Sequence, residues 1–165
     1  MESIINKFYK AFQNLDAERM AECYHGDIVF EDPAFGVLKG ERASNMWRML
    51  CDSQKGKDFK LIYSNVKADE NTGSALWEAF YTFSKTGRKI HNPVQAQFKF
   101  KDGKIINHMD SFDLYKWSKQ ALGFKGAVLG KTLFFKNKVR YNTSKMLDEF
   151  EKSVINDAQK TVVDT

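Results

Sequence analysis

The chain has 165 residues, of which 42% are hydrophobic and 28% charged. This balance is typical of one globular domain and excludes a disordered or fibrous protein. No apolar run approaches the ~20 residues of a membrane-spanning helix, and the N-terminus lacks the basic and apolar segments of a signal peptide. Cys23 and Cys51 have neither disulfide nor metal-ligand spacing, so a reducing, cytoplasmic location is expected.

Three helices are expected in the first third of the chain. Apolar residues recur with helical spacing over residues 3–14, 17–24 and 41–52. Asp16 is placed to cap the second helix, and Tyr24 to offer a hydroxyl from that helix to the interior.

A short strand is expected between the second and third helices, over residues 27–31. It runs into the segment Phe30–Pro33, which contains a Glu-Asp-Pro motif. Proline fixes its own φ and keeps the preceding residue extended. Asp32 is therefore expected on a stiff corner at a strand end, where a carboxylate can be aimed.

Longer strands are expected over residues 58–68, 74–84, 89–101 and 104–114, which are rich in alternating, aromatic and β-branched residues. The Asp102–Gly103 pair between the last two is a strong hairpin signal. Consecutive long strands of this kind predict a strongly curved antiparallel sheet.

Three helices followed by these strands, with Glu-Asp-Pro after the first strand, resemble the nuclear transport factor 2-like superfamily, and within it the SnoaL-like and ketosteroid-isomerase-like group. The resemblance covers about residues 4–114. Its other markers are Asn14-Leu15-Asp16, Gly40, Gly87-Arg88-Lys89, Phe98-Lys99-Phe100 and Gly103-Lys104-Ile105.

The resemblance implies an α+β fold in which a cone-shaped, curved antiparallel sheet packs on three N-terminal helices, with residues 1–114 as the domain. Members of the superfamily include isomerases, polyketide cyclases, epoxide hydrolases, dehydratases and non-catalytic binders. The fold therefore implies no single activity.

In ketosteroid isomerases, the aspartate of the Glu-Asp-Pro corner is the general base, and that role maps onto Asp32. The two oxyanion donors of those enzymes would fall at Phe8 and Ala96. Neither side chain can donate a hydrogen bond, so true ketosteroid isomerase activity is not expected.

A second chemical feature is His108-x-Asp110 on the last strand. Residues i and i+2 of a strand share a face, and the resemblance places this pair on the concave side. With Asp32 across the pocket, the three form a candidate catalytic set for acid–base chemistry. The alternative is structural: an aspartate before proline is a common turn residue, and His108 and Asp110 can form a satisfied polar pair.

Aromatic residues are expected to line the pocket, which predicts a small, mostly apolar ligand. No cofactor is expected, because the chain has no glycine-rich phosphate loop. No metal site is expected, because the three histidines lack ligand spacing. The candidate ligand-binding residues are Tyr24, Trp47, Trp77, Tyr81, Phe98 and Phe112.

Residues 115–153 form a basic extension, with nine basic and three acidic residues against 16 of each in residues 1–114. Helices are expected over 115–122 and 131–153, packing on the same domain at the pocket mouth or along the sheet, and a flexible tail over 154–165. The lysines are expected to be a solvated face. Contact with an acidic membrane is the less favoured alternative, because acidic residues at 148–151 interrupt the basic stripe.

The leading hypothesis is a small-molecule enzyme of the isomerase, cyclase, dehydratase or epoxide-hydrolase type. The alternatives are a non-catalytic binder of a hydrophobic ligand and a protein-interaction module. Glu78 and His91 are expected on the outer sheet face, where related proteins pair, so a homodimer is predicted. Nucleic-acid binding is not expected, because the domain is charge-balanced and carries no recognisable motif.

Overall fold

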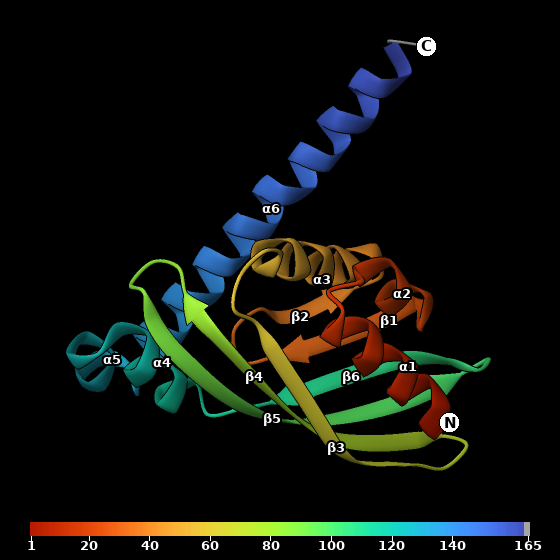
Figure 1. Ribbon diagram of the computed structural model, residues 1–165, viewed down its shortest axis with the longest axis horizontal. Helices are drawn as coiled ribbons and strands as arrows, with labels where there is room; N and C mark the ends of the chain where they lie inside the picture. The colour runs from red at the N-terminus through yellow and green to blue at the C-terminus, as the bar shows by residue number, and fades with distance from the viewer. Residues whose placement is uncertain (164–165) are drawn as a thin grey trace.

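A single six-stranded sheet carries helices on one face and at one end (Figure 1). The computed structural model describes residues 1–163, and all of their side chains except those of residues 157, 158 and 160–163. The elements are α1 (Glu2–Gln13), α2 (Ala17–Glu22), β1 (Tyr24–Asp32), β2 (Gly36–Lys39), α3 (Glu41–Gln54), β3 (Lys60–Ala68), β4 (Thr72–Phe83), β5 (Arg88–Lys101), β6 (Lys104–Ser111), α4 (Leu114–Leu122), α5 (Phe124–Leu129) and α6 (Leu133–Val163).

The strands lie in the order β2-β1-β6-β5-β4-β3. All neighbours are antiparallel except β1 and β6, which pair in parallel. That pairing sets Phe30 opposite His108 and Glu31 opposite Met109. The α+β class and the curved sheet are confirmed, and the parallel pair brings the Glu-Asp-Pro corner beside the His-x-Asp strand.

Helices α1, α2 and α3 cover the concave face of the sheet (Figure 1). The helical spacing of the sequence is confirmed, since α1 buries Ile5, Phe8, Tyr9 and Phe12. Asp16 caps α2 as expected, with its side chain accepting a hydrogen bond from the Arg19 backbone N–H.

The boundaries that differ from the prediction include the start of β1 and the end of β6. Tyr24 is the first residue of β1 and is not on the second helix, because the Ile105 N–H binds the Cys23 carbonyl and draws the chain into the sheet. The last strand ends at Ser111, not at 114, because Asp113 caps α4 by accepting from the Lys116 N–H at 2.9 Å.

The basic extension packs against the body through α4 and α6. Trp117 of α4 donates to the Tyr81 hydroxyl at 2.8 Å. From α6, Arg140 donates to the Pro33 carbonyl at 3.3 Å and Thr143 to the Ala34 carbonyl at 2.9 Å. Helix α6 thus lies over the Glu-Asp-Pro corner, and its C-terminal half projects beyond the body (Figure 1).

Helix α6 is longer than the sequence predicted. It continues to Val163, through most of the segment expected to be a flexible tail. Residues 164 and 165 of that predicted tail lie outside the described residues.

Candidate functional site

A chain of hydrogen bonds crosses the core between α3 and β4. The Trp47 indole N–H donates to the Tyr24 hydroxyl at 2.8 Å, and that oxygen lies 2.7 Å from His108 Nδ1. His108 Nε2 lies 3.0 Å from Asp110 Oδ1, which also accepts from the Trp77 indole N–H at 3.2 Å. Five side chains from β1, α3, β4 and β6 therefore form one buried network.

One arrangement of protons satisfies every group in this network. An indole N–H can only donate, so Trp47 fixes the Tyr24 oxygen as an acceptor and leaves the Tyr24 hydrogen free to bind His108 Nδ1. His108 is then a neutral imidazole with its proton on Nε2, which donates to the Asp110 carboxylate. Both nitrogens of His108 are engaged.

Aromatic rings enclose His108, whose side chain is completely buried. Its ring centroid lies 4.5 Å from that of Phe98, 5.2 Å from Phe30, 5.4 Å from Phe8 and 6.0 Å from Trp47. No substrate can contact the imidazole without moving these rings.

Asp32 is more accessible than His108. It is partly buried at the end of β1, and its Oδ1 accepts from the Phe35 N–H at 2.5 Å. Burial is the main cause that raises the pKa of Asp32 to about 7; the Phe35 N–H opposes this rise and the charge of Asp110 adds to it. A carboxyl group with this pKa exchanges its proton readily at neutral pH.

Asp110 is 4% exposed and uses only one of its two oxygens in the network. Both the His108 and the Trp77 contacts go to Oδ1, and Oδ2 accepts no hydrogen bond from any other described residue. Because the charge of Asp110 raises the pKa of Asp32, the two carboxylates act on each other through the interior. The structure joins His108 to Asp110 by a hydrogen bond and places Asp32 at the end of the neighbouring strand β1. Their action as one catalytic set stays a prediction.

The predicted wall residues come from several elements: Tyr24, Trp77, Tyr81 and Phe98 lie on strands, Trp47 lies on α3, and Phe112 follows β6. Trp47, Trp77 and Phe98 are buried together with Tyr24, whereas Tyr81 and Phe112 are partly buried. The α4 helix covers Tyr81 through Trp117. The apolar pocket that these residues would line stays a prediction.

The sequence analysis did not select Tyr9, a buried residue of α1. Its ring stacks on Tyr63 with centroids 5.2 Å apart. The Tyr9 hydroxyl is buried and has no hydrogen-bond partner among the described residues. Burial raises the pKa of Tyr9 well above its usual value, with a further contribution from the charge of Asp110. The phenol is therefore a neutral donor held near the carboxylate network.

Replacing Tyr9 by phenylalanine is expected to increase the free energy of unfolding by about 1 kcal/mol, because an unpaired buried hydroxyl loses its hydration without compensation. Chemical denaturation at pH 7 measures the change. Tyr81→Phe is the matched control and is expected to change stability in the opposite direction, since the Tyr81 hydroxyl accepts from Trp117. If Tyr9→Phe lowers the free energy of unfolding, the Tyr9 hydroxyl has a hydrogen-bond partner and the interpretation is wrong.

Arg140 and Thr143 of α6 were also not predicted at the corner. They bind the carbonyls that follow Asp32 from more than 100 residues away in the sequence. The basic composition of the extension was the only available signal, and it does not identify a contact.

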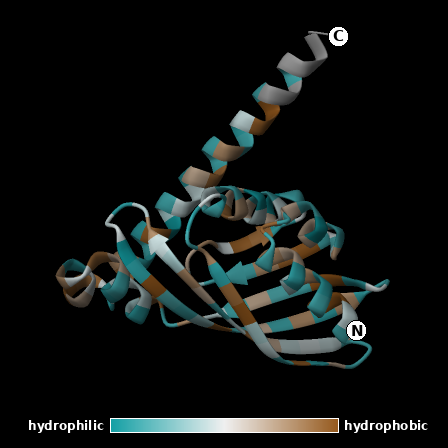
Figure 2. Ribbon diagram, in the orientation of Figure 1, coloured by the Kyte–Doolittle hydropathy of each residue, from teal (hydrophilic) through white to brown (hydrophobic). Residues whose placement is uncertain are grey.

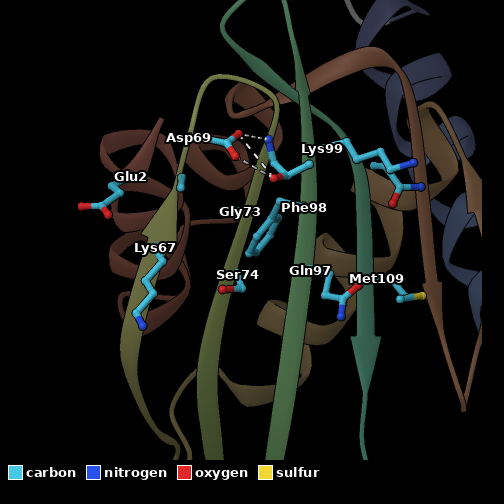
Figure 3. A pocket seen from close by; sticks show the side chains of 12 residues that line it. Glu2, Lys67, Asp69, Gly73, Ser74, Gln97, Phe98, Lys99 and Met109 are labelled. Carbon is cyan, nitrogen blue, oxygen red and sulfur yellow. Dashed lines mark hydrogen bonds between the residues drawn. The ribbon is translucent and has the colours of Figure 1, made fainter.

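A shallow groove of about 770 Å³ lies apart from this network, over strands β3 to β6 (Figure 3). Gln97, Lys99, Asn107 and Met109 line it, and these residues alternate with the inward Phe98 and His108 along β5 and β6. The groove is therefore on the convex face, where Asp69 and Lys67 also border it. Asp32, His108 and Asp110 are not among its lining residues, so this groove is not the predicted pocket.

Among the described residues, no group of three or more histidine, cysteine, aspartate or glutamate side chains is arranged to hold a metal ion. No helix in residues 1–163 is long and apolar enough to cross a membrane. On the convex face, His91 binds Glu78 through its Nε2.

The fold, the corner and the buried network define a cone-shaped domain of a known kind. The SnoaL-like domain family matches residues 5–108, more than half of the chain, and the chain belongs to this family. The resemblance to SnoaL-like proteins is thereby confirmed. No curated protein is similar enough to be matched.

Solved structures show the same fold. An LEH-like epoxide hydrolase of M. tuberculosis is 22% identical with a TM-score of 0.58, and the alignment covers 76% of this chain and 90% of the hydrolase. A protein described as a SnoaL-like polyketide cyclase from Jannaschia sp. CCS1 is 12% identical with a TM-score of 0.62, covering 73% and 90%. TerC, which was co-crystallised with polyporic acid, is 16% identical with a TM-score of 0.60, covering 72% and 95%. At these identities, the fold alone is shared.

Proposed function

We propose that this chain is a cofactor-independent enzyme that moves protons on a small, mostly apolar substrate, with Asp32 as the residue that exchanges the proton. The observation that supports this most directly is the position of Asp32. Its carboxyl group is partly buried at a rigid corner, has a pKa of about 7, and is coupled to the fixed carboxylate of Asp110.

Asp110 is the second candidate for contact with substrate, through its free oxygen Oδ2. The charge of Asp110 favours the protonated form of Asp32, so Asp32 can act as the acid while the Asp110 carboxylate acts as the base. A carbonyl- or epoxide-bearing substrate fits this pair, because both reactions need a proton delivered to oxygen and a second group to remove one from carbon or water.

His108 is a positioning residue in this proposal. Its imidazole is enclosed and its two nitrogens are occupied, so it acts on the substrate only through Asp110. Tyr24, Trp47 and Trp77 have the same role, since each contributes one hydrogen bond to the network.

A non-catalytic binder of a hydrophobic ligand is the second candidate. The saturated network favours it, because a histidine with both nitrogens engaged is well suited to a fixed wall. The unpaired Tyr9 hydroxyl would then meet a polar atom of the ligand. Formation of a homodimer through the convex face also stays a prediction.

The test begins with native mass spectrometry of the purified full chain, which identifies copurified small molecules. Each identified molecule, and its carbonyl- and epoxide-bearing relatives, is then incubated with wild type, Asp32→Asn and Asp110→Asn. We expect both variants to retain the ligand and to lose about 10²–10⁴-fold in turnover.

Asp27→Asn is the matched control, because Asp27 is an exposed aspartate on the same strand. Its turnover is expected to equal that of wild type. If wild type turns over none of the ligands that it binds, the enzyme is excluded and the binder is supported. Loss of ligand from Asp32→Asn with turnover per bound ligand unchanged would assign Asp32 to binding alone.

A further inference from the structure

Large apolar side chains are exposed together where α5 meets α6. The most exposed are Phe124 at 83%, Leu133 at 72% and Phe134 at 71%, followed by Val128 and Leu129. We call these five residues the apolar tip. They lie at the end of the body, where α4 and α5 stand away from the helices on the concave face (Figures 1 and 2).

The backbone forces this exposure. Helix α5 packs on Ser118 of α4 through glycine: a Cβ on Gly126 would lie 1.9 Å from the Ser118 carbonyl oxygen, and one on Gly130 would lie 2.1 Å from Ser118 Oγ. Ser118 is completely buried and donates to the Gly126 carbonyl. Because only glycine fits the inward side of α5, its large apolar residues are turned outward and held there.

The segment that carries the apolar tip is rich in lysine and contains no acidic residue. Residues 114–147 contain eight basic and no acidic residues. Lys119 and Lys131 lie over the ring of Tyr115 at 4.6 and 4.9 Å. Six exposed lysines of this segment form no ion pair with any described carboxylate; they are Lys116, Lys119, Lys125, Lys131, Lys136 and Lys138.

The acidic residues near the end of the extension do not interrupt this surface. Asp148 binds Arg42 of α3 at 2.6 Å, and Glu151 binds the same guanidinium. These two are directed toward the body, and the third acidic residue, Glu149, is exposed and lies 3.9 Å from Lys145 one turn away on α6. At 1.5 Å per helical residue, Asp148 is also about 21 Å along α6 from Phe134. The sequence-based argument against a continuous basic surface is therefore removed by the fold.

We propose that the apolar tip docks onto an anionic lipid bilayer. Phenylalanine and leucine side chains would enter the boundary between headgroups and acyl chains, while the lysines lie at the level of the negatively charged headgroups. A second copy of the chain fits the tip less well, because apolar contact between two tips would bring two sets of unpaired lysines together. This inference does not depend on the proposed enzymatic function.

The test is flotation of the full chain with vesicles of phosphatidylcholine alone and of phosphatidylcholine with 30% phosphatidylserine. We expect binding to the anionic vesicles, at least about tenfold stronger than to the neutral ones at low salt, and weakened by 0.5 M salt. Phe124→Ser with Phe134→Ser is expected to reduce the partition coefficient about tenfold per residue. Lys125→Gln and Lys131→Gln are expected to reduce it about fivefold each.

Two exposed residues outside the tip provide matched controls. Val37→Ser removes an apolar side chain that is 54% exposed on β2, and Lys57→Gln removes an exposed lysine after α3. Neither is expected to change vesicle binding. Far-UV circular dichroism checks that the tip variants remain folded. Absent or charge-independent binding by wild type would overturn the proposal, as would sedimentation velocity showing a dimer that the phenylalanine substitutions dissociate without any vesicle binding.

Discussion

Replacing His108 by alanine is expected to lower the free energy of unfolding by about 3–5 kcal/mol. The substitution leaves a cavity among four aromatic rings, because Phe8, Phe30, Phe98 and Trp47 pack against the imidazole. It also removes the partner of the Tyr24 hydroxyl and one of the two donors to Asp110. The cavity and the unpaired polar groups both lower the free energy of unfolding.

Urea denaturation at pH 7 measures this effect, with His91→Ala as the matched control. The side chain of His91 is 45% exposed and binds Glu78 at the surface, so its loss is expected to cost less than about 1 kcal/mol. A double-mutant cycle of Tyr24→Phe and His108→Ala isolates their coupling. If His108→Ala costs less than about 1 kcal/mol, the buried network does not exist as described.

Replacing Asp32 by asparagine is expected to stabilise the protein above pH 7 while removing its turnover. The pKa of Asp32 is about 7 in the folded protein, against 3.8 for the unperturbed group. The folded state therefore holds the proton more tightly than the unfolded state does. The resulting stability is fully present below pH 4 and is lost as the pH rises through 7.

Asparagine is uncharged at every pH and retains an oxygen that can accept from the Phe35 N–H. At pH 8, the variant is expected to be more stable than wild type by on the order of 2 kcal/mol, a value reduced from the full shift because Asp32 is only partly buried. At pH 4, the two are expected to be equally stable. The difference between their stabilities should therefore develop between pH 4 and 7.

Urea denaturation at several pH values measures this difference. Asp27→Asn is the control, and its stability relative to wild type is expected not to change with pH. A variant that is less stable than wild type at pH 8 would show that the Asp32 charge is favourable at the corner. If Asp32→Asn gains stability and loses turnover, the burial that destabilises the charged Asp32 carboxylate is retained because catalysis requires it.

The features of this protein that depend on residues close together in the sequence were predictable. Helical spacing placed Phe8 and Phe12 in the core. Strand alternation put Phe98 on one face of its strand and His108 with Asp110 on one face of theirs, and the family resemblance identified those faces as the inward ones. The Glu-Asp-Pro corner was predictable because proline restricts its own φ and that of the residue before it. Local rules were enough for these features, because periodicity and turn chemistry act over a few residues.

Only the tertiary structure decided which of these residues meet. The parallel pairing of β1 with β6 carries Tyr24 to His108, a separation of 84 residues, and α6 returns to Pro33 across 107 residues. Glycines of α5 turn apolar residues outward only because Ser118 lies behind them. Such contacts depend on how curved surfaces fit together, and no pattern within a single element specifies that fit. The sequence, read together with its family resemblance, determined the fold, the corner and the faces of the strands, whereas the tertiary structure decided the network, the cover over Asp32 and the exposed apolar tip.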